Sequence, residues 1–359
     1  MGPVGPDGVE DPKQTGRRAA CCGLRQLQPE GKNDRRFSPG RGPGGEFTEI
    51  TTEGFAEAKG SCNLVAMEPS KLIFACVALG GAVLATGVFA AGRVYENPSH
   101  DPANWTWNVP DPVKGVRHGE VHSVAMNRTV GYNIYLPPGY ESAPERRYPV
   151  VYFLHGATGT EKSDCGFARI VAAEIAAGTI GEVIYVFPNG GARSRYADWP
   201  DENVKAETWI MKELIPHIDA EYRTIGTAAA RAVTGFSMGG DGSVRLATKY
   251  PGVFCAAASM AGAFGWNVDD ASGEKDTAFR WSSQHTERLK DRLALKFVCG
   301  SVDRLLNNHH RFLAHLDELK LGYVYTVHPE VGHNLGKLTE LSGPEIIRWL
   351  ATKYQPATE

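Results

Sequence analysis

The sequence lacks the cysteine patterns of zinc-binding and disulfide-rich proteins. It has seven cysteines in 359 residues, with no C-x-x-C pair and no cluster of cysteine with histidine, so no metal site is expected. Only Cys165, Cys255 and Cys299 fall in the part of the chain that we expect to fold. One disulfide among these three is compatible with the sequence, which does not indicate the pair.

An excess of charge of either sign is also missing. The 38 basic and 41 acidic side chains give a formal net charge of -3. Proteins that bind nucleic acid or steer charged ligands over long distances usually carry a strong charge imbalance. The sequence therefore predicts neither nucleic acid nor a strongly charged partner.

Residues 1–66 lack a hydrophobic pattern of period 2 or 3.6. Glycine and proline are dense there, as in Pro39-Gly40 and Gly42-Pro43-Gly44-Gly45. The apolar content is too low to offset the entropy lost on ordering a chain. We interpret residues 1–66 as a disordered tail.

One long apolar run follows, from Leu72 to Ala91, without a charged residue. About 20 apolar residues are enough to cross a bilayer as a helix. Residues 67–92 are therefore interpreted either as a membrane anchor or as a cleaved signal peptide. The second interpretation puts the true start at Met67 and makes residues 1–66 an upstream extension.

Both interpretations predict a protein that is secreted or membrane-anchored and extracytoplasmic. Any contact with the membrane would be made only through residues 72–91, if they are not cleaved. Residues 93–115, rich in proline and asparagine, read as a linker.

Residues 116–355 show strands that alternate with helices, which predicts a mostly parallel sheet covered on both faces. The expected fold class is therefore α/β. Strands are expected at Val121–Met126, Val130–Leu136, Tyr148–Leu154, Gly181–Phe187, Ala228–Val233, Phe254–Ser259, Leu293–Cys299 and Tyr323–His328, and helices at Phe167–Ala177, Ala206–Tyr222, Asp241–Tyr250, Asn307–Leu321 and Pro344–Tyr354.

The motif G-x-S-x-G occurs once in the centre of this region, as Gly235, Ser237 and Gly239. An apolar run precedes it and a helical pattern follows it, which is the context of a nucleophile elbow. A serine on such a sharp turn has a strained backbone that only very small neighbours accommodate. Ser237 is therefore the predicted nucleophile.

A serine nucleophile needs a histidine base and an acid that orients it. In α/β-hydrolases these follow in the order serine, acid, histidine, each after a strand. Asp303 and His333 lie in the loops after the strands 293–299 and 323–328 and are the predicted acid and base. The alternative base is His328, and the acids that we consider less suitable are Asp269, Asp270 and Asp241.

An oxyanion hole needs two backbone N–H groups. Met238, directly after the nucleophile, supplies one in this prediction, and Ala157, in the loop after the strand 148–154, supplies the other, with Gly156 as the alternative. His155 is expected to hold this loop in place.

Several segments together resemble an esterase family of α/β-hydrolases that includes feruloyl and acetylxylan esterases, S-formylglutathione hydrolase and the antigen 85 mycolyltransferases. The resemblance covers about residues 116 to 355. It rests on Tyr132–Tyr140, Tyr148–Gly156, Phe187–Gly190, Glu213–Asp219 and Gly235–Gly240. It implies an acyl-enzyme mechanism with Ser237, Asp303 and His333 as the triad, Met238 and Ala157 as the oxyanion hole, and no cofactor. Asn334–Lys337 lacks the aromatic residue that many relatives carry after the histidine, which leaves the acyl pocket undefined.

The substrate is less well specified. Tyr196, Asp198, Trp199 and Trp266 lie in loops near the predicted site, where they would either contact the substrate or pack the loops. We expect an ester substrate: an acylated sugar, a phenolic ester or a lipid ester. The alternatives to an esterase are an acyltransferase that uses the same triad and a non-catalytic envelope-binding protein with this fold.

Overall fold

The computed structural model describes residues 105, 113–199, 203–265, 269 and 273–358. The predicted tail (1–66), the predicted signal peptide or anchor (67–92) and most of the predicted linker (93–115) lie outside these residues. Within them, none of the helices has the length and apolar content that a membrane span requires.

The described residues form one sheet of eight strands in the order β1-β2-β4-β3-β5-β6-β7-β8. β1 and β2 form an antiparallel hairpin at one end, β2 also runs antiparallel to β4, and all later neighbours are parallel. This arrangement confirms the predicted α/β-hydrolase fold. The strands are β1 Val116–Ser123, β2 Arg128–Tyr135, β3 Val150–Leu154, β4 Ile184–Pro188, β5 Arg231–Phe236, β6 Ala256–Met260, β7 Ala294–Gly300 and β8 Val324–His328.

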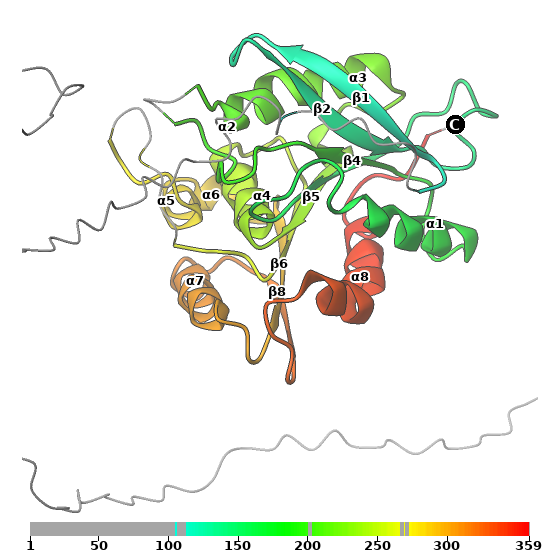
Figure 1. Ribbon diagram of the computed structural model, residues 1–359. Coiled ribbons are helices and arrows are strands. Elements are labelled where there is room, and N and C mark those ends of the chain that lie inside the picture. The colour runs from blue at the N-terminus through cyan, green and yellow to red at the C-terminus, as the bar shows by residue number, and fades with distance from the viewer. Residues whose placement is uncertain (1–104, 106–112, 200–202, 266–268, 270–272, 359) are drawn as a thin grey trace, which may run out of the picture. The chain divides into compact units, whose positions relative to one another are not determined.

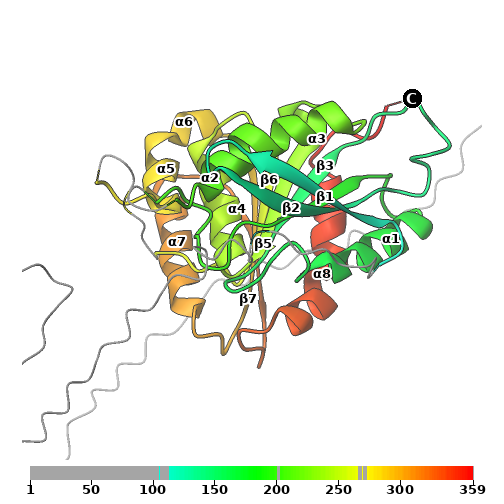
Figure 2. The same cartoon turned by 45° about the horizontal axis from the view of Figure 1, so that its top comes forward.

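Helices cover both faces of the sheet (Figures 1 and 2). One face carries α1 and α8, and the other carries α4, α5 and α7. A separate hydrophobic core lies on each face, because the central strands β3 to β6 are apolar and buried on both sides. The helices are α1 Ala168–Ala176, α2 Ala206–Thr208, α3 Ile215–Glu221, α4 Met238–Lys249, α5 Ala278–Gln284, α6 Thr286–Leu289, α7 Leu306–Glu318 and α8 Leu335–Ala351, with a π-helical segment, Trp209–Leu214, joining α2 to α3.

Two expectations about helices were wrong. The last helix begins at Leu335 and not at Pro344, because the Asn334 side chain caps it by accepting the N–H of Lys337 at 3.0 Å. Pro344 lies inside this helix. The helices α5 and α6, in the segment between β6 and β7, were not predicted.

Candidate active site

Ser237 lies at a sharp turn between β5 and α4. Its backbone has φ 55° and ψ -112°, a region that residues with a side chain seldom adopt. The turn is tight enough that a Cβ at Gly239 would lie 1.9 Å from the Leu154 carbonyl oxygen, and one at Gly235 would lie 2.5 Å from it. The glycines of the motif are therefore required by the close approach of β3 to the turn.

The structure brings Ser237, His333 and Asp303 together from three separate loops. His333 Nε2 lies 2.9 Å from Ser237 Oγ, and His333 Nδ1 lies 2.9 Å from Asp303 Oδ2. Because the carboxylate accepts the Nδ1 proton, Nε2 is left to accept the serine proton. The three side chains form the geometry of a nucleophile, a base and an orienting acid.

The acid of this group is held ionised. Burial raises the pKa of Asp303, but the hydrogen bonds from His333 and from the Leu305 N–H outweigh it and leave the pKa below its usual value. The imidazole of His333 also stacks on the Phe236 ring, with the centroids 4.8 Å apart. The base is therefore fixed by a ring on one side and a carboxylate at one end.

The alternative candidates have other partners. His328 Nε2 lies 2.5 Å from Ser342 Oγ in α8, and Asp269 forms an exposed ion pair with Lys275. Asp241 lies in the first turn of α4, where burial raises its pKa to about 7. Asp270 lies outside the described residues.

The predicted oxyanion donors lie on the two expected elements. Met238 is the first residue of α4, so its N–H has no partner within the helix. Ala157 is exposed, and its neighbours in the loop are held: Thr158 N–H donates to the Ala192 carbonyl, and Gly159 N–H donates to the Gly156 carbonyl. Both predicted N–H groups are thus in segments with a defined conformation.

His155 has the structural role expected of it. Its Nδ1 lies 2.8 Å from the Gly156 carbonyl, and its Nε2 accepts the Gly190 N–H at 2.9 Å. Burial lowers its pKa to about 4, so the ring is neutral at pH 7 and donates from Nδ1. It ties the loop after β3 to the loop after β4.

Of the four residues proposed to contact substrate, three are described, and each has a structural partner. Tyr196 is fully buried and donates its hydroxyl to the His155 carbonyl at 3.0 Å, so it supports the loop and the expectation of a substrate contact was wrong. Asp198 accepts the N–H and the hydroxyl of Thr208 at the start of α2. Trp199 donates its indole N–H to a backbone carbonyl in its own loop. Trp266 lies outside the described residues.

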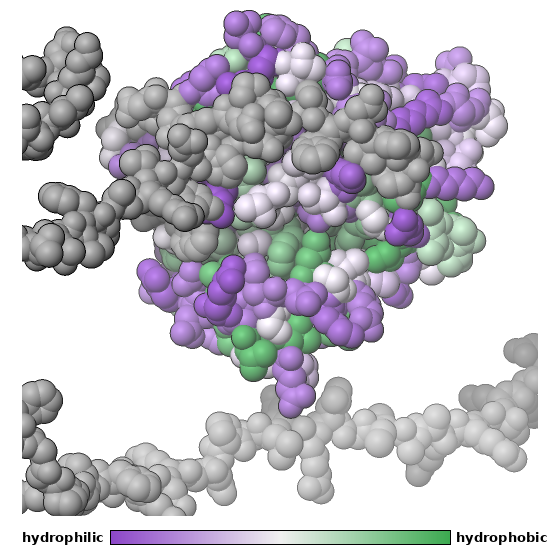
Figure 3. Space-filling model, viewed as in Figure 1, coloured by the Kyte–Doolittle hydropathy of each residue, from purple (hydrophilic) through white to green (hydrophobic). Residues whose placement is uncertain are grey.

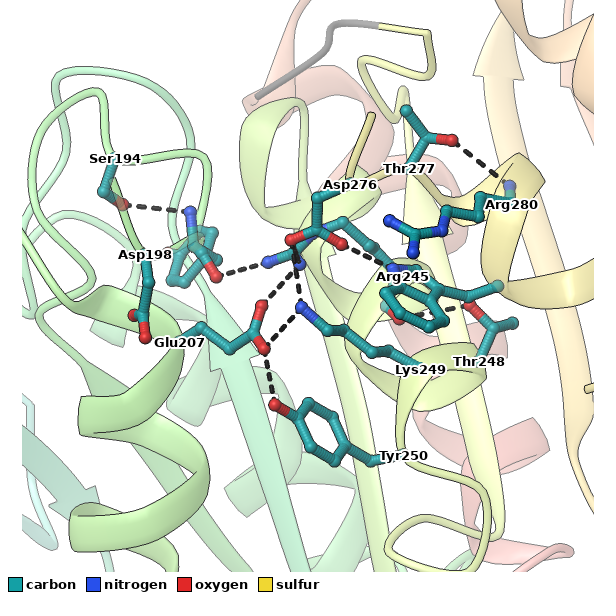
Figure 4. Close-up of polar contacts among 12 residues, drawn as sticks. Ser194, Asp198, Glu207, Arg245, Thr248, Lys249, Tyr250, Asp276, Thr277 and Arg280 are labelled. Carbon is teal, nitrogen blue, oxygen red and sulfur yellow. Dashed lines mark hydrogen bonds and ion pairs between the residues drawn. The ribbon is translucent and has the colours of Figure 1, made fainter. Parts of the chain in front are cut away.

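A buried ionic cluster on α4 was missed by sequence reasoning (Figure 4). Arg245 donates to Glu207 in α2 and to Asp276 before α5, and also to the Tyr196 carbonyl. Lys249 reaches both acids, at 2.7 and 3.1 Å. The cluster links the helix that follows Ser237 to two neighbouring segments. The sequence indicates this cluster only by the charge of Arg245 within the helix that follows Ser237, and that charge does not identify the partner residues.

A cavity of about 240 Å³ lies beside the start of α8. Its lining comes from β3, from the segment between β3 and α1, and from the first turns of α8: Phe153, Ser163, Asp164, Gly166, Phe167, Leu335, Gly336 and Thr339. Leu335 stands only two residues after His333, so one end of the cavity adjoins the loop that carries the base.

The described residues contain no group of three side chains able to hold a metal ion. Cys165, Cys255 and Cys299 are all free thiols.

Comparison with known proteins identifies the family. The family profile described as "Putative esterase" matches residues 123–317. The chain belongs to this esterase family. Among curated proteins, the chain is 32% identical over 177 residues to Esterase Rv1288 of Mycobacterium tuberculosis. It is 26% identical over 278 residues to an endo-1,4-beta-xylanase/feruloyl esterase of Xylanibacter ruminicola.

These alignments cover 47% and 62% of this chain, and 34% and 37% of the relatives, so the chain spans about a third of the curated proteins it matches. Among solved structures, a ferulic acid esterase superposes with a TM-score of 0.61 at 24% identity, covering 67% of this chain and 98% of that one. The S-formylglutathione hydrolase of Staphylococcus aureus superposes with a TM-score of 0.54 at 15% identity, covering 66% and 98%. These likenesses show the shared fold.

Proposed function

We propose that this protein is a serine hydrolase that cleaves carboxylic esters through an acyl-enzyme. The observation that carries the proposal is the continuous chain of contacts from Ser237 Oγ through the His333 ring to the Asp303 carboxylate. A serine hydroxyl alone is a weak nucleophile at neutral pH, and this chain removes its proton as it attacks. Membership of an esterase family supports the same reaction class.

The proposed reaction has two steps. Ser237 Oγ bonds to the ester carbonyl carbon while His333 Nε2 takes its proton, and the protonated ring then gives that proton to the leaving alcohol. The N–H groups of Met238 and Ala157 stabilise the negative carbonyl oxygen of each tetrahedral intermediate. Water, deprotonated by His333, then attacks the acyl-enzyme and releases the acid, which restores Ser237.

The alcohol and acyl parts of the substrate are left to assay. The cavity of about 240 Å³ beside the start of α8 is mostly apolar, and Leu335 in its lining follows His333 by two residues; we propose that the cavity receives part of a small acyl group. Feruloyl esterases appear among the relatives, so a phenolic ester belongs in the first substrate panel together with acetylated sugars and lipid esters. Added alcohol in the same assay separates hydrolysis from acyl transfer, because a transferase passes the acyl group to the alcohol instead of water.

The direct test is Ser237→Ala, assayed with p-nitrophenyl acetate. We expect release of p-nitrophenol to fall by several orders of magnitude, since triad members act as a unit, while circular dichroism and the melting temperature stay near those of the wild type. Ser142→Ala, which removes an exposed hydroxyl in the segment between β2 and β3, is the control and should keep its activity. Undiminished turnover by Ser237→Ala would remove the mechanism.

We also propose that the catalytic domain acts outside the cytoplasm, on the basis of the apolar run from Leu72 to Ala91. Sequencing the N-terminus of the protein recovered from its host tests this. A start near Ala91 supports a cleaved signal peptide, an uncleaved chain in the membrane fraction supports an anchor, and an uncleaved chain in the cytosol contradicts both.

A further inference from the structure

The last strand, β8, forms an edge of the sheet that no other described element covers. β8 pairs with β7 alone, in parallel, and it lies outermost at the lower side of the molecule in Figure 1. The opposite edge, β1, carries Arg117, Glu120 and two histidines, which protect it against pairing with other chains. Val324–His328 has no acidic or basic residue other than its final histidine.

The hydrogen-bonding groups of this edge can be assigned from the register. The Ser301 N–H donates to the His328 carbonyl at 2.8 Å, so the backbone groups of His328 face β7. In a parallel pair the backbone groups of alternate residues face the same side. Those of Tyr325 and Val327 therefore face away from the sheet and are free to pair with another strand.

Exposed apolar side chains gather around the same edge. Five large hydrophobic residues of the described part are exposed, and four of them are Val302, Val324, Val327 and Leu341. Val324 and Val327 lie in β8, Val302 is bonded to the loop after β8, and Leu341 precedes Ser342, which contacts His328. Figure 3 shows hydrophobic surface at the lower end of the molecule, where Figure 1 places the loop between β8 and α8. A concentration of exposed apolar side chains is typical of an interaction surface.

We propose that β8 pairs with β8 of a second copy of this chain, antiparallel and about a two-fold axis at Thr326. In this register the Tyr325 N–H donates to the Val327 carbonyl of the second copy, and the Tyr325 carbonyl accepts the N–H of the same Val327. By symmetry, Val327 of the first copy bonds in the same way to Tyr325 of the second. The edge is thus complementary to itself, which is what a two-fold interface requires. The eight strands of each copy join into one continuous sheet.

Charge at the ends of the strand fits this arrangement. The exposed Lys320 lies in the turn before β8, and the exposed Glu330 lies in the turn after it. An antiparallel pairing centred on Thr326 brings the turn with Lys320 of one copy to the turn with Glu330 of the other, at both ends of the interface. A parallel pairing would place like charges together instead. Glu330 also lies in the loop that leads to His333, so the second copy would contact the outer side of that loop.

Light scattering of the full-length chain during gel filtration gives the first test. We expect twice the mass of one 38.9 kDa chain. Thr326→Lys places two lysines opposite each other at the axis and should yield monomers with unchanged turnover of p-nitrophenyl acetate. Val124→Lys, at an exposed valine in the turn between β1 and β2, is the matched control and should remain a dimer. A monomeric wild type would overturn the proposal, as would a dimer that Thr326→Lys leaves intact.

Cysteine cross-linking tests the register. Residues opposite each other in a pair without hydrogen bonds have Cα atoms about 4.5 Å apart, within the range of a disulfide. Thr326→Cys should therefore form a covalent dimer on mild oxidation, in contrast to the wild type. Val327→Cys would face its own copy only diagonally, about 7–8 Å away, and should cross-link poorly. The reverse result would refute the pairing about Thr326.

Discussion

Replacing Arg245 by methionine should destabilise the protein strongly. The Arg245 side chain is 2% exposed, and its two carboxylate partners, Glu207 and Asp276, are 6% and 3% exposed. Methionine fills much of the volume, but Lys249 is then the remaining cation beside the two buried acids, and the Tyr196 carbonyl loses the Arg245 donor. Breaking a buried ion pair by removing one partner costs about 3–5 kcal/mol.

This loss of unfolding free energy corresponds to a melting temperature lower by roughly 6–20 °C, at about 2–4 °C per kcal/mol for a domain of this size. Thermal denaturation followed by circular dichroism measures it. The control is Arg117→Met, which breaks an ion pair whose side chains are 57% and 69% exposed and should cost at most about 1 kcal/mol.

A second variant separates lost charge balance from lost packing. Adding Asp276→Asn to Arg245→Met leaves one buried acid, Glu207, paired with Lys249, and keeps an acceptor for the indole N–H of Trp281. Part of the lost stability should return. If Arg245→Met melts within 2 °C of the wild type, or if the double variant is less stable than Arg245→Met, the reasoning about this cluster is refuted.

Three further predictions concern the site and the residues beneath it. Asp303→Asn should reduce kcat for p-nitrophenyl acetate by about 10³–10⁴-fold, as an asparagine stabilises the wrong tautomer of the triad histidine; a loss below tenfold would contradict this role. Gly239→Ala should lower the unfolding free energy, measured by urea denaturation, by more than the about 1 kcal/mol of a typical substitution. The reason is that its Cβ would lie 1.9 Å from the Leu154 carbonyl oxygen. Gly181→Ala, whose Cβ would have no atom within 4 Å, should leave the unfolding free energy nearly unchanged. Burial lowers the pKa of His309 to about 4. The folded protein therefore binds fewer protons than the unfolded chain between pH 6.5 and 4, and it loses stability as the pH falls through this range. His309→Leu should show a smaller drop in unfolding free energy from pH 7 to pH 5 than the wild type, and an equal drop would count against the argument.

The fold was predictable where a hydrophobic pattern or a motif determines the local conformation. Apolar runs separated by helical segments located seven of the strands to within three residues at each end. The prediction of the first strand was wrong: it runs from Val116 to Ser123 and not from Val121 to Met126, because residues 124–127 form the hairpin turn. The order of Ser237, Asp303 and His333 along the chain also predicted which loops meet, because parallel strands end at one edge of the sheet. Close contact of the three side chains depends on the fold as a whole, and the structure supplies it.

Other features could not be read from the sequence. Tyr196 looked like an exposed aromatic of a substrate loop, but its ring packs against Gly190 and Gly242, where a Cβ would collide with it. The partners of Arg245 come from segments 31 and 38 residues away, and no periodic pattern connects them. The early start of α8 depends on a single side-chain cap at Asn334, which outweighed the proline taken as the start of the helix.

The central claim is that one serine hydroxyl, activated by the histidine and aspartate next to it, performs the chemistry. Reaction of the protein with a fluorophosphonate, followed by peptide mapping, tests it most directly. The account predicts a single phosphonylated residue, Ser237, with loss of ester hydrolysis in proportion to labelling. An active protein that is not labelled at Ser237, or hydrolysis that persists after full labelling of Ser237, would contradict it.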